Sequence, residues 1–349
     1  IKEIKKKIPN SHIKVVCSNI NYFLCQEAKF VDEFCIYDNK MSFLSKMKFL
    51  KNIKKDSYDY LFNFCQSIES FLILLLSKSK IKSTLIYLSR YKNPSRSKNF
   101  QKLISRILNI NNLIINRRKL FKTKSNFHQT NIMFELVNKK IPIKNPKNFV
   151  FLPENYQIEK NSEKRILLHL SNRWIDENYD ENQFIELLEK LKKKSKLYLT
   201  TDHSSGSSFD VVLKKYIKLN DASFNELPVY KDNIIILDKL NFKNWRKIIL
   251  NSKLVITYEC GCVHVSAMSN IPQIIVYDYK NEPFMIHEEY SPLTKKYEKV
   301  IITQNLINQE IMSKLNQIDE QQAIFVKDQT TVFEKISITL HSAKNGSIM

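Results

Sequence analysis

The chain has 349 residues, of which 43% are hydrophobic, and its 56 Lys and Arg against 35 Asp and Glu give a formal net charge of +21. This apolar content excludes an intrinsically disordered protein, and the length favours two domains. The positive charge would suit a nucleic acid, an anionic membrane surface or a negatively charged substrate. Because the basic residues are spread along the whole chain, we expect no nucleic-acid partner, whereas contact with anionic lipid stays open.

The first half of the chain alternates short apolar strands with helices. Ile1, Ile4 and Ile8 share one face of a helix that Pro9 ends. Further helices are predicted over residues 21–28, 43–55 and 69–76, and strands over residues 13–17, 33–37, 58–65 and 83–88. This alternation is typical of a parallel α/β sheet. Residues 92–147 have a looser pattern with one helix at 129–138, and the proline-punctuated stretch 141–147 is interpreted as the approach to an interdomain linker.

The second half repeats the alternation more clearly. Strands are predicted over residues 165–169, 197–201, 233–237, 254–258, 274–277 and 299–303, and helices over 181–193, up to about 217, 244–250 and 304–315. They predict a second doubly wound sheet of five to six strands. We therefore expect an α/β protein whose two domains, residues 1–148 and 149–318, face each other across a cleft. The tail of residues 319–349, with an amphipathic stretch at 332–340, is expected to pack on the surface.

The cysteines indicate reduced thiols in a cytoplasmic protein, because they form neither a paired metal-binding spacing nor a regular disulfide framework. They are Cys17, Cys25, Cys35, Cys65, Cys260 and Cys262. A zinc site at the last two would need two further ligands, and only His264 lies near them in the sequence. We therefore expect no metal.

The ends of the chain and its apolar runs bear on targeting. The chain begins at Ile1 without a Met, so we expect its natural beginning to lie upstream. Its first residues have a charged helical pattern rather than the apolar segment typical of a signal peptide. The longest apolar run, Phe71–Leu76, is too short to cross a bilayer.

A turn at residues 259–262 joins a buried strand to a short helix of small residues, and it is the strongest candidate for a ligand site. Gly261 lies in this turn, and the chain has only two other glycines, at 206 and 346. The amino end of a helix offers free N–H groups and a positive dipole end, which suit a phosphate. The alternative is that Gly261 only relieves a steric clash in a strand-to-helix turn.

A second loop follows the strand 165–169 and carries Ser171, Asn172 and Arg173. The planar guanidinium of Arg173 suits a phosphate, and the two neighbouring side chains add hydrogen-bonding groups. The alternative is a solvated loop in which only Trp174 packs. In open α/β sheets ligands bind at the carboxyl ends of the strands, where this loop and the glycine turn would both lie.

Two further positions at that edge are open to simpler interpretations. Thr201 begins a hydroxyl-rich loop, but such a loop is usually a turn before a helix, with Asp202 or Ser204 as the N-cap. His264 lies near the start of the helix after the glycine turn, where a buried, satisfied histidine is the commoner outcome. Taken together, the arginine, the helix amino end and the carboxylate of Glu259 favour a phosphate-bearing ligand.

The run TYECGCVHVSA at residues 257–267, followed by Asn270-Ile271-Pro272 and an apolar strand, resembles the signature of glycosyltransferase family 9. The family pattern is Asp-Ser/Thr-Gly-x-x-His-Leu-x-Ala-Ala, then Gly-Thr-Pro and a strand. Residues 169–174 and the helix after them resemble the family's His-Pro-Gly…Lys-x-Trp-Pro loop and helix, and three segments before residue 65 resemble its first domain. These similarities keep the family's order from near residue 1 to about residue 316.

The resemblance implies a GT-B-type fold with two Rossmann-like domains, an acceptor-side domain before residue 149 and a nucleotide-sugar-binding domain after it. It implies transfer of a sugar from a nucleotide diphosphate donor, and the best-known members move heptose from ADP-heptose onto the lipopolysaccharide inner core without a metal. The expected partners are therefore a nucleotide sugar, with ADP as the expected nucleotide, and lipopolysaccharide core or another glycan. The expected place is the cytoplasm, at the inner face of the membrane.

Donor-binding roles follow from the matched positions. The resemblance implies that backbone N–H groups near Gly261 and Cys262 hold the diphosphate, that Arg173 neutralises it where the family usually has Lys, and that Glu259 meets the donor sugar where the family usually has Asp. The expected donor-binding set is Ser171, Asn172, Arg173, Glu259, Cys260, Gly261, Cys262 and His264. His287 and Glu288 are further candidates for the donor sugar or base, Thr201 lies at the same edge, and His128 is a candidate on the acceptor side.

The chain also departs from the family pattern. Glu259 is one methylene longer than the usual Asp, and Cys262 stands where the family often has Pro. The family's proposed aspartate base lies in a loop that would precede Ile1, so no general base is assigned. Two other functions stay open at this point: a nucleotide-sugar-binding protein that has lost the chemistry, and a basic RNA- or lipid-binding protein.

Overall fold

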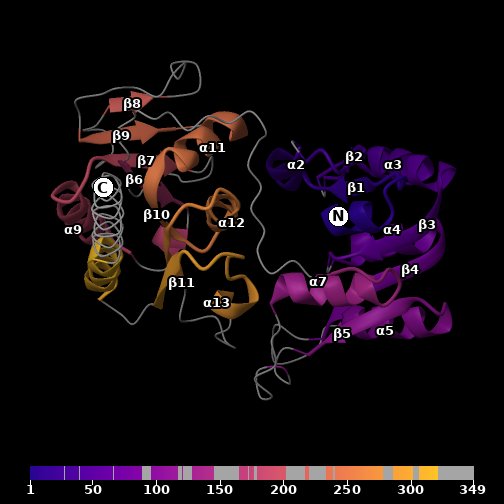
Figure 1. The fold of residues 1–349 in the computed structure, drawn as a ribbon. Coiled ribbons are helices and arrows are strands. Elements are labelled where there is room, and N and C mark those ends of the chain that lie inside the picture. The colour runs from indigo at the N-terminus through magenta and orange to yellow at the C-terminus, as the bar shows by residue number, and fades with distance from the viewer. Residues whose placement is uncertain are drawn as a thin grey trace, which may run out of the picture. The chain divides into compact units, whose positions relative to one another are not determined.

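The structure is a computed structural model, and its elements are labelled in Figure 1. It describes residues 1–26, 28–38, 40–65, 67–88, 96–116, 120, 128–144, 165–171, 173–176, 179–201, 217–219, 233–238, 240–277, 286–301 and 306–320. The chain divides into two compact units: unit 1 is Ile1–Phe149 with Lys280–Ser291, and unit 2 is Val150–Tyr279 with Pro292–Met349. The segment Lys280–Ser291, which lies inside the expected second domain, thus groups with unit 1.

Unit 1 is built from parallel strands and the helices between them. Its helices are α1 (Lys2–Lys7), α2 (Asn19–Cys25), α3 (Phe43–Lys55), α4 (Ile68–Leu76), α5 (Arg96–Ile107), α7 (Gln129–Asn138) and α13 (Ile286–Glu289). Its strands are β1 (Lys14–Cys17), β2 (Glu33–Ile36), β3 (Ser57–Asn63), β4 (Lys78–Tyr87) and β5 (Asn111–Ile115). Serine side chains at positions 18, 42 and 67 cap the amino ends of α2, α3 and α4, which is why these helices begin where they do.

The strands of unit 1 form two sheets, β1-β2 and β3-β4-β5, rather than one. The looser stretch after residue 92 is also more regular than predicted, because it contains α5 and β5.

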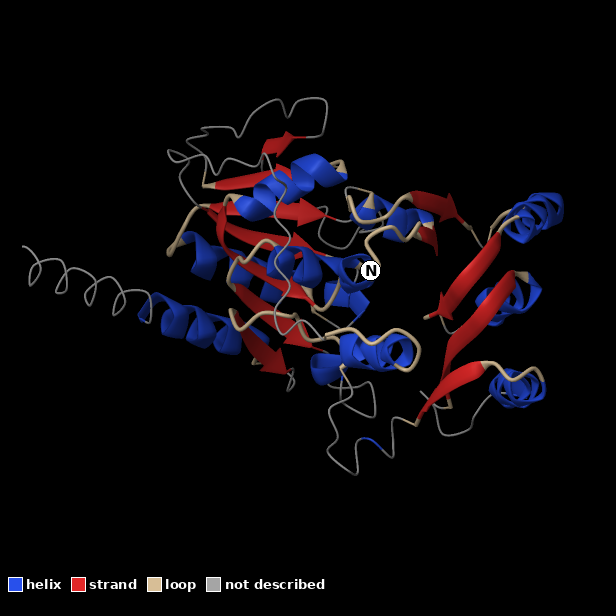
Figure 2. Ribbon diagram, turned by 45° about the vertical axis from the view of Figure 1, so that its right-hand side comes forward, coloured by secondary structure: helices blue, strands red, loops and turns tan. Residues whose placement is uncertain are grey.

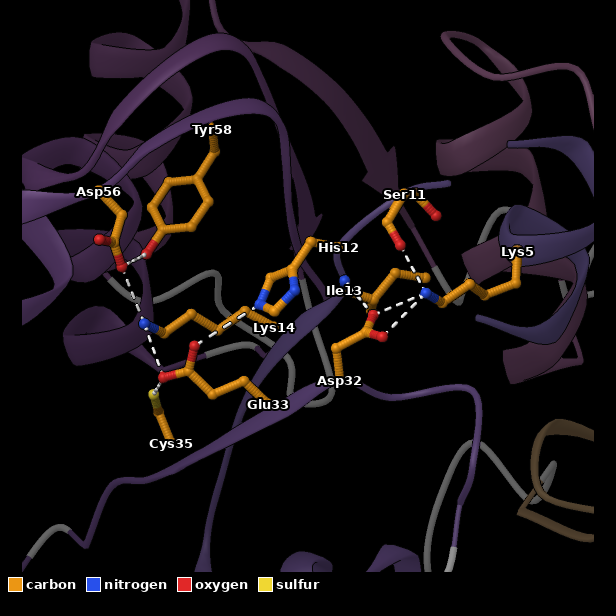
Figure 3. A network of polar contacts seen from close by, with 10 residues as sticks. All are labelled: Lys5, Ser11, His12, Ile13, Lys14, Asp32, Glu33, Cys35, Asp56 and Tyr58. Carbon is orange, nitrogen blue, oxygen red and sulfur yellow. Dashed lines mark hydrogen bonds and ion pairs between the residues drawn. The ribbon is translucent and has the colours of Figure 1, made fainter. Parts of the chain in front are cut away.

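A network of polar contacts links the two sheets of unit 1 at the start of their strands, as Figure 3 shows. Lys14 Nζ, at the beginning of β1, lies 2.9 Å from Glu33 Oε1 of β2 and 2.9 Å from Asp56 Oδ2, which precedes β3. The hydroxyl of Tyr58 donates to the same Asp56 oxygen over 3.3 Å. The Lys14 ammonium lowers the pKa of both carboxyl groups, and although burial opposes it, contact with the carboxylates raises the pKa of Lys14.

We expect Lys14→Met to lower the melting temperature of unit 1 near neutral pH. Carboxyl groups whose folded-state pKa is depressed stabilise the fold above their unfolded-state pKa, and that contribution disappears as the pH falls through the folded-state pKa. The difference between the two proteins should therefore shrink below about pH 4. Thermal melts across this range measure it. The matched control is Lys80→Met, because the Lys80 side chain is 77% exposed in its ion pair with Asp59, against 13% for Lys14.

Unit 2 contains one seven-stranded parallel sheet in the order β12-β11-β10-β6-β7-β9-β8. Its strands are β6 (Arg165–Leu170), β7 (Leu197–Thr201), β8 (Ile217–Leu219), β9 (Ile234–Leu237), β10 (Ser252–Tyr258), β11 (Gln273–Tyr277) and β12 (Tyr297–Ile301). Its helices are α8 (Arg173–Asp176), α9 (Glu181–Lys192), α11 (Phe242–Leu250), α12 (Gly261–Met268) and one over residues 307–320. Every residue of β6, β9 and β11 is buried, as expected for a parallel sheet covered on both faces.

The sheet has seven strands rather than the predicted five to six, because the sequence did not reveal β8, a three-residue strand at the sheet edge. A strand this short has too few residues for an alternating pattern to be recognised. The helix predicted before residue 217 and the tail stretch 332–340 lie outside the described residues. Within the described part of the chain, no helix is both long and apolar enough to span a bilayer.

Candidate functional site

The carboxyl ends of three neighbouring strands in unit 2 bring the predicted loops together. Strands β6 and β10 are paired in parallel, with His169 opposite Thr257, so Ser171 and Glu259 each lie two residues beyond one register pair. On the other side of β6, Thr201 of β7 is the register partner of Leu170. The sheet order therefore places the Ser171, Thr201 and Glu259 loops side by side, as predicted.

Arg173 and Glu259 form an ion pair between Nη1 and Oε2. Arg173 begins α8 and Glu259 follows β10, so the contact joins the loop after β6 to the turn after β10. The Arg173 side chain is 48% exposed, whereas that of Glu259 is 11% exposed. A guanidinium has five N–H donors, and the carboxylate takes only part of them. The remaining donors can bind an anion while Glu259 holds the group in position.

Trp174 fixes the loop that carries Arg173. It is fully buried, and its Nε1 donates a hydrogen bond to the carbonyl oxygen of His169 over 3.0 Å. The centroid of its ring lies 5.0 Å from that of Tyr179 and 4.6 Å from that of Tyr258, both in edge-to-face geometry. Trp174 therefore packs, but the loop is not merely solvated, because Ser171 is also buried and Arg173 is paired with Glu259. The packing of Trp174 is what positions Arg173.

Helix α12 begins beside the ion pair without a side-chain cap. Its N-cap residue, Cys260, is extended, with a φ of −163°, and makes no capping hydrogen bond. Gly261, the first helical residue, is exposed, and no described glycine has a positive φ. The backbone conformation therefore does not require glycine here. The missing side chain instead leaves the amino end of the helix open, which favours anion binding over the steric alternative.

Ser171 supplies a buried polar atom without a partner. Its hydroxyl oxygen is buried and makes no hydrogen bond to any described residue. An orphaned hydroxyl in a folded protein calls for an explanation such as a ligand, since leaving it unpaired costs roughly 1–3 kcal/mol. Its neighbour Asn172, the other predicted hydrogen-bonding residue of this loop, lies outside the described residues.

The surroundings of the two cysteines of the turn favour the protonated form of their thiols. Burial raises the pKa of Cys260 and raises that of Cys262 well above its usual value. His264 is exposed, not buried as the simpler interpretation had it, and it is two residues from Cys262, so the two side chains face apart on α12. Within the described ranges, no three His, Cys, Asp or Glu side chains are grouped so as to hold a metal ion.

Thr201 has a side-chain partner that the sequence did not suggest. Its hydroxyl donates to Asp238 Oδ1 over 2.6 Å, and Asp238 directly follows β9. The signal that could have identified Asp238 is its position, because an acidic residue immediately after a buried strand also lies at the carboxyl edge.

The remaining candidates lie in unit 1. His128 caps α7: its Nδ1 accepts from the N–H of Thr130 over 3.2 Å, so its Nε2 carries the proton and donates to the carbonyl of Ser291 over 2.8 Å. Both ring nitrogens thus hold local structure, which is a structural reason for a histidine at this position. His287 and Glu288 lie on α13, with 3.8 Å between Nε2 and Oε1, and belong to a different unit from the Glu259 turn.

Residues 46–318 match glycosyltransferase family 9 (heptosyltransferase), and this match spans most of the chain. The chain belongs to glycosyltransferase family 9. It is therefore a glycosyltransferase, which confirms the prediction made from the turn at residues 257–267. The match begins at Lys46, so the resemblance of the segments before it rests on their order alone.

Solved structures of family 9 proteins share the fold. E. coli heptosyltransferase WaaC with ADP-2-deoxy-2-fluoro heptose is 12% identical, with a TM-score of 0.62 over 90% of this chain and 93% of that chain. E. coli ADP-heptose lipopolysaccharide heptosyltransferase II is 13% identical, with a TM-score of 0.61 over 92% and 93%. The family 9 protein of Veillonella parvula is 12% identical, with a TM-score of 0.59 over 90% and 84%. Comparison with curated proteins gives no match.

Proposed function

We propose that this family 9 glycosyltransferase moves a heptose or a related sugar from an ADP-linked donor to lipopolysaccharide core or another cell-surface glycan. The observation that carries the proposal is the Arg173–Glu259 ion pair beside the uncapped amino end of α12. A half-exposed guanidinium and a helix amino end together suit a diphosphate, and a carboxylate next to them suits sugar hydroxyls. E. coli heptosyltransferase WaaC, which shares the fold, is described with ADP and with ADP-2-deoxy-2-fluoro heptose.

The chemistry explains why cationic groups are needed here. The bond between the anomeric carbon and the diphosphate oxygen breaks, and the acceptor oxygen forms a new bond to that carbon while its proton passes to a base. Negative charge then builds on the departing nucleoside diphosphate. We assign its stabilisation to Arg173 and to the N–H groups at the start of α12, because donors fixed in advance act most strongly where charge develops. We propose that the donor binds without a metal.

Glu259 and Ser171 have separate tasks in this proposal. The Glu259 carboxylate orients Arg173 and accepts hydrogen bonds from the donor sugar, and its length relative to aspartate changes which hydroxyl it reaches. The buried Ser171 hydroxyl donates to a phosphate oxygen and so gains the partner it lacks among the described residues. No described residue is assigned as the base that takes the acceptor proton.

The test of the donor and acceptor is a transfer assay. The protein is incubated with ADP-heptose and lipopolysaccharide that lacks heptose, and mass spectrometry follows the acceptor and the release of ADP. We expect the acceptor to gain the mass of one heptose. Consumption of a different nucleotide sugar in preference to ADP-heptose would overturn the donor assignment. ADP-heptose bound in calorimetry but never transferred would point to the donor-binding protein considered above.

Gly261→Val tests whether the start of α12 contacts the diphosphate. We expect calorimetry to show ADP binding at least about tenfold weaker, because a branched side chain covers the first N–H groups of the helix. Stability should not fall, since the residue has no positive φ and glycine is already the poorer helix former. Gly261→Ala, with one methyl group, is the control and should bind ADP with an intermediate affinity. Equal affinities for all three proteins would remove the turn from the site.

A further inference from the structure

Three helices of unit 1 form a layer on one face of the β3-β4-β5 sheet. Helix α4 packs on β3, α5 packs on β4 and β5, and α4 lies between α3 and α5. Figure 2 shows the three helices side by side along that face of the sheet. The side of this layer that points away from the sheet is called the outer face below.

The outer face is unusually apolar. Of the sixteen large hydrophobic side chains exposed in the described part of the chain, ten lie on it. They are Phe43, Leu44 and Met47 of α3, Ile68, Leu72 and Leu76 of α4, Phe100, Leu103 and Ile107 of α5, and Leu108 directly after it. The residues of α4 and α5 are spaced by three or four positions, so each set forms a stripe along one side of its helix. Isolated exposed apolar residues are ordinary, but a contiguous group indicates an interaction surface.

Helix α5 makes the point most clearly, because most of its apolar side chains are on its exposed side. The side turned inward carries the buried polar residues Gln101 and Ser105 beside the partly buried Ile104, whereas Phe100, Leu103 and Ile107 are exposed. Ile107 is 66% exposed, and Leu44 of α3 is 79% exposed. Packing against the sheet explains neither the burial of the polar residues nor the exposure of the apolar ones. These side chains therefore fit a partner outside the described residues.

The charges around these stripes are almost all positive. Helix α3 contains five lysines and no acidic residue, and α5 contains two arginines, two lysines and no acidic residue. The single acid of α4, Glu69, is already paired with Lys46 of α3 over 3.0 Å. Lys48, Lys51 and Lys54 are exposed. Apolar side chains flanked by an excess of basic residues are the composition of a helix that lies in the interface of an anionic bilayer.

We propose that the outer face docks on an anionic lipid bilayer, with the apolar side chains among the acyl chains and the lysines at the lipid phosphates. A second copy of the chain fits less well, because two such faces would bring lysines against lysines. A nucleic acid would match the charge but would leave the ten apolar side chains exposed. The proposed function gives the contact a purpose, since a glycolipid acceptor is carried by a membrane, but lipid binding itself requires neither donor nor acceptor.

The test is co-sedimentation with vesicles of phosphatidylcholine, with and without phosphatidylglycerol. We expect binding only to the vesicles that contain the anionic lipid, and a loss of binding at high salt. The variant Leu103→Glu with Ile107→Glu should bind those vesicles at least about tenfold less. The matched control is Ile185→Glu with Leu306→Glu, which adds the same charge at exposed apolar residues of unit 2 and should bind like the unaltered protein.

The outcomes separate this proposal from its rivals and from the proposed function. Absence of binding to anionic vesicles would overturn it, and so would equal loss in the two double variants. If ultracentrifugation showed a dimer that the Leu103 and Ile107 changes abolish, the face would be an interface between copies instead. Circular dichroism melts are run on every variant, because a retained melting transition shows that unit 1, which carries Leu103 and Ile107, is folded. Calorimetry with ADP makes the same check for unit 2. A failure of ADP binding in the unaltered protein would count against the proposed function alone.

Discussion

Replacing Arg173 with alanine is expected to weaken ADP binding by roughly 1.5–3 kcal/mol, or about one to two orders of magnitude in Kd. The reason is the loss of hydrogen bonds between a charged donor and a diphosphate. A second effect acts in the same direction: the mostly buried Glu259 carboxylate would face the diphosphate without its cation. Isothermal titration calorimetry with ADP measures the change directly.

Two related variants show how much of this loss of affinity depends on the shape of the guanidinium and what the Glu259 carboxylate contributes. Arg173→Lys keeps the charge but loses the planar fork, so its affinity for ADP should fall between those of the unaltered protein and Arg173→Ala. Glu259→Gln removes the carboxylate but keeps the size, and it should affect ADP-heptose more than ADP if the carboxylate contacts the sugar. If Arg173→Ala bound ADP as tightly as the unaltered protein, Arg173 would have no place in the donor site.

Trp174→Ala is expected to lower the free energy of unfolding of unit 2 by about 3–5 kcal/mol, as for other buried tryptophans. The side chain is fully buried between two tyrosine rings, and its loss leaves a cavity under α8 and removes the hydrogen bond to His169. Denaturant unfolding followed by circular dichroism measures the change. ADP binding should weaken as well, because Arg173 begins the helix that Trp174 anchors.

Two control variants separate packing from hydrogen bonding at this position. Trp174→Phe keeps an aromatic ring but loses the Nε1 donor, so it should cost less than the alanine variant. Trp245, the other tryptophan of the chain, is only partly buried, and Trp245→Ala should also cost less. A loss below about 1 kcal/mol for Trp174→Ala would show that the surrounding rings close the cavity.

Local patterns predicted most of the fold correctly, because helices and strands are recognised from neighbours in the sequence. The bounds of α3, α7 and β7 agree with the predictions residue by residue. The failures have local causes too. Helix α5 was missed because the polar Gln101 and Ser105 turn inward and most of its apolar residues lie outward among basic ones, so the pattern does not resemble a helix that packs on a sheet.

The sequence by itself determined the α/β class, the strand-to-helix turn at Gly261 and the family, since each depends on residues close together in the chain. Only the tertiary structure decided which of the candidate residues meet. Arg173 and Glu259 are 86 residues apart, and they form a pair because β6 and β10 are adjacent in the sheet with His169 opposite Thr257. Strand order is a long-range property set by how whole strands and helices pack, and no local pattern encodes it. The same holds for the outer face of unit 1, whose exposed apolar side chains become one surface only where α3, α4 and α5 lie side by side.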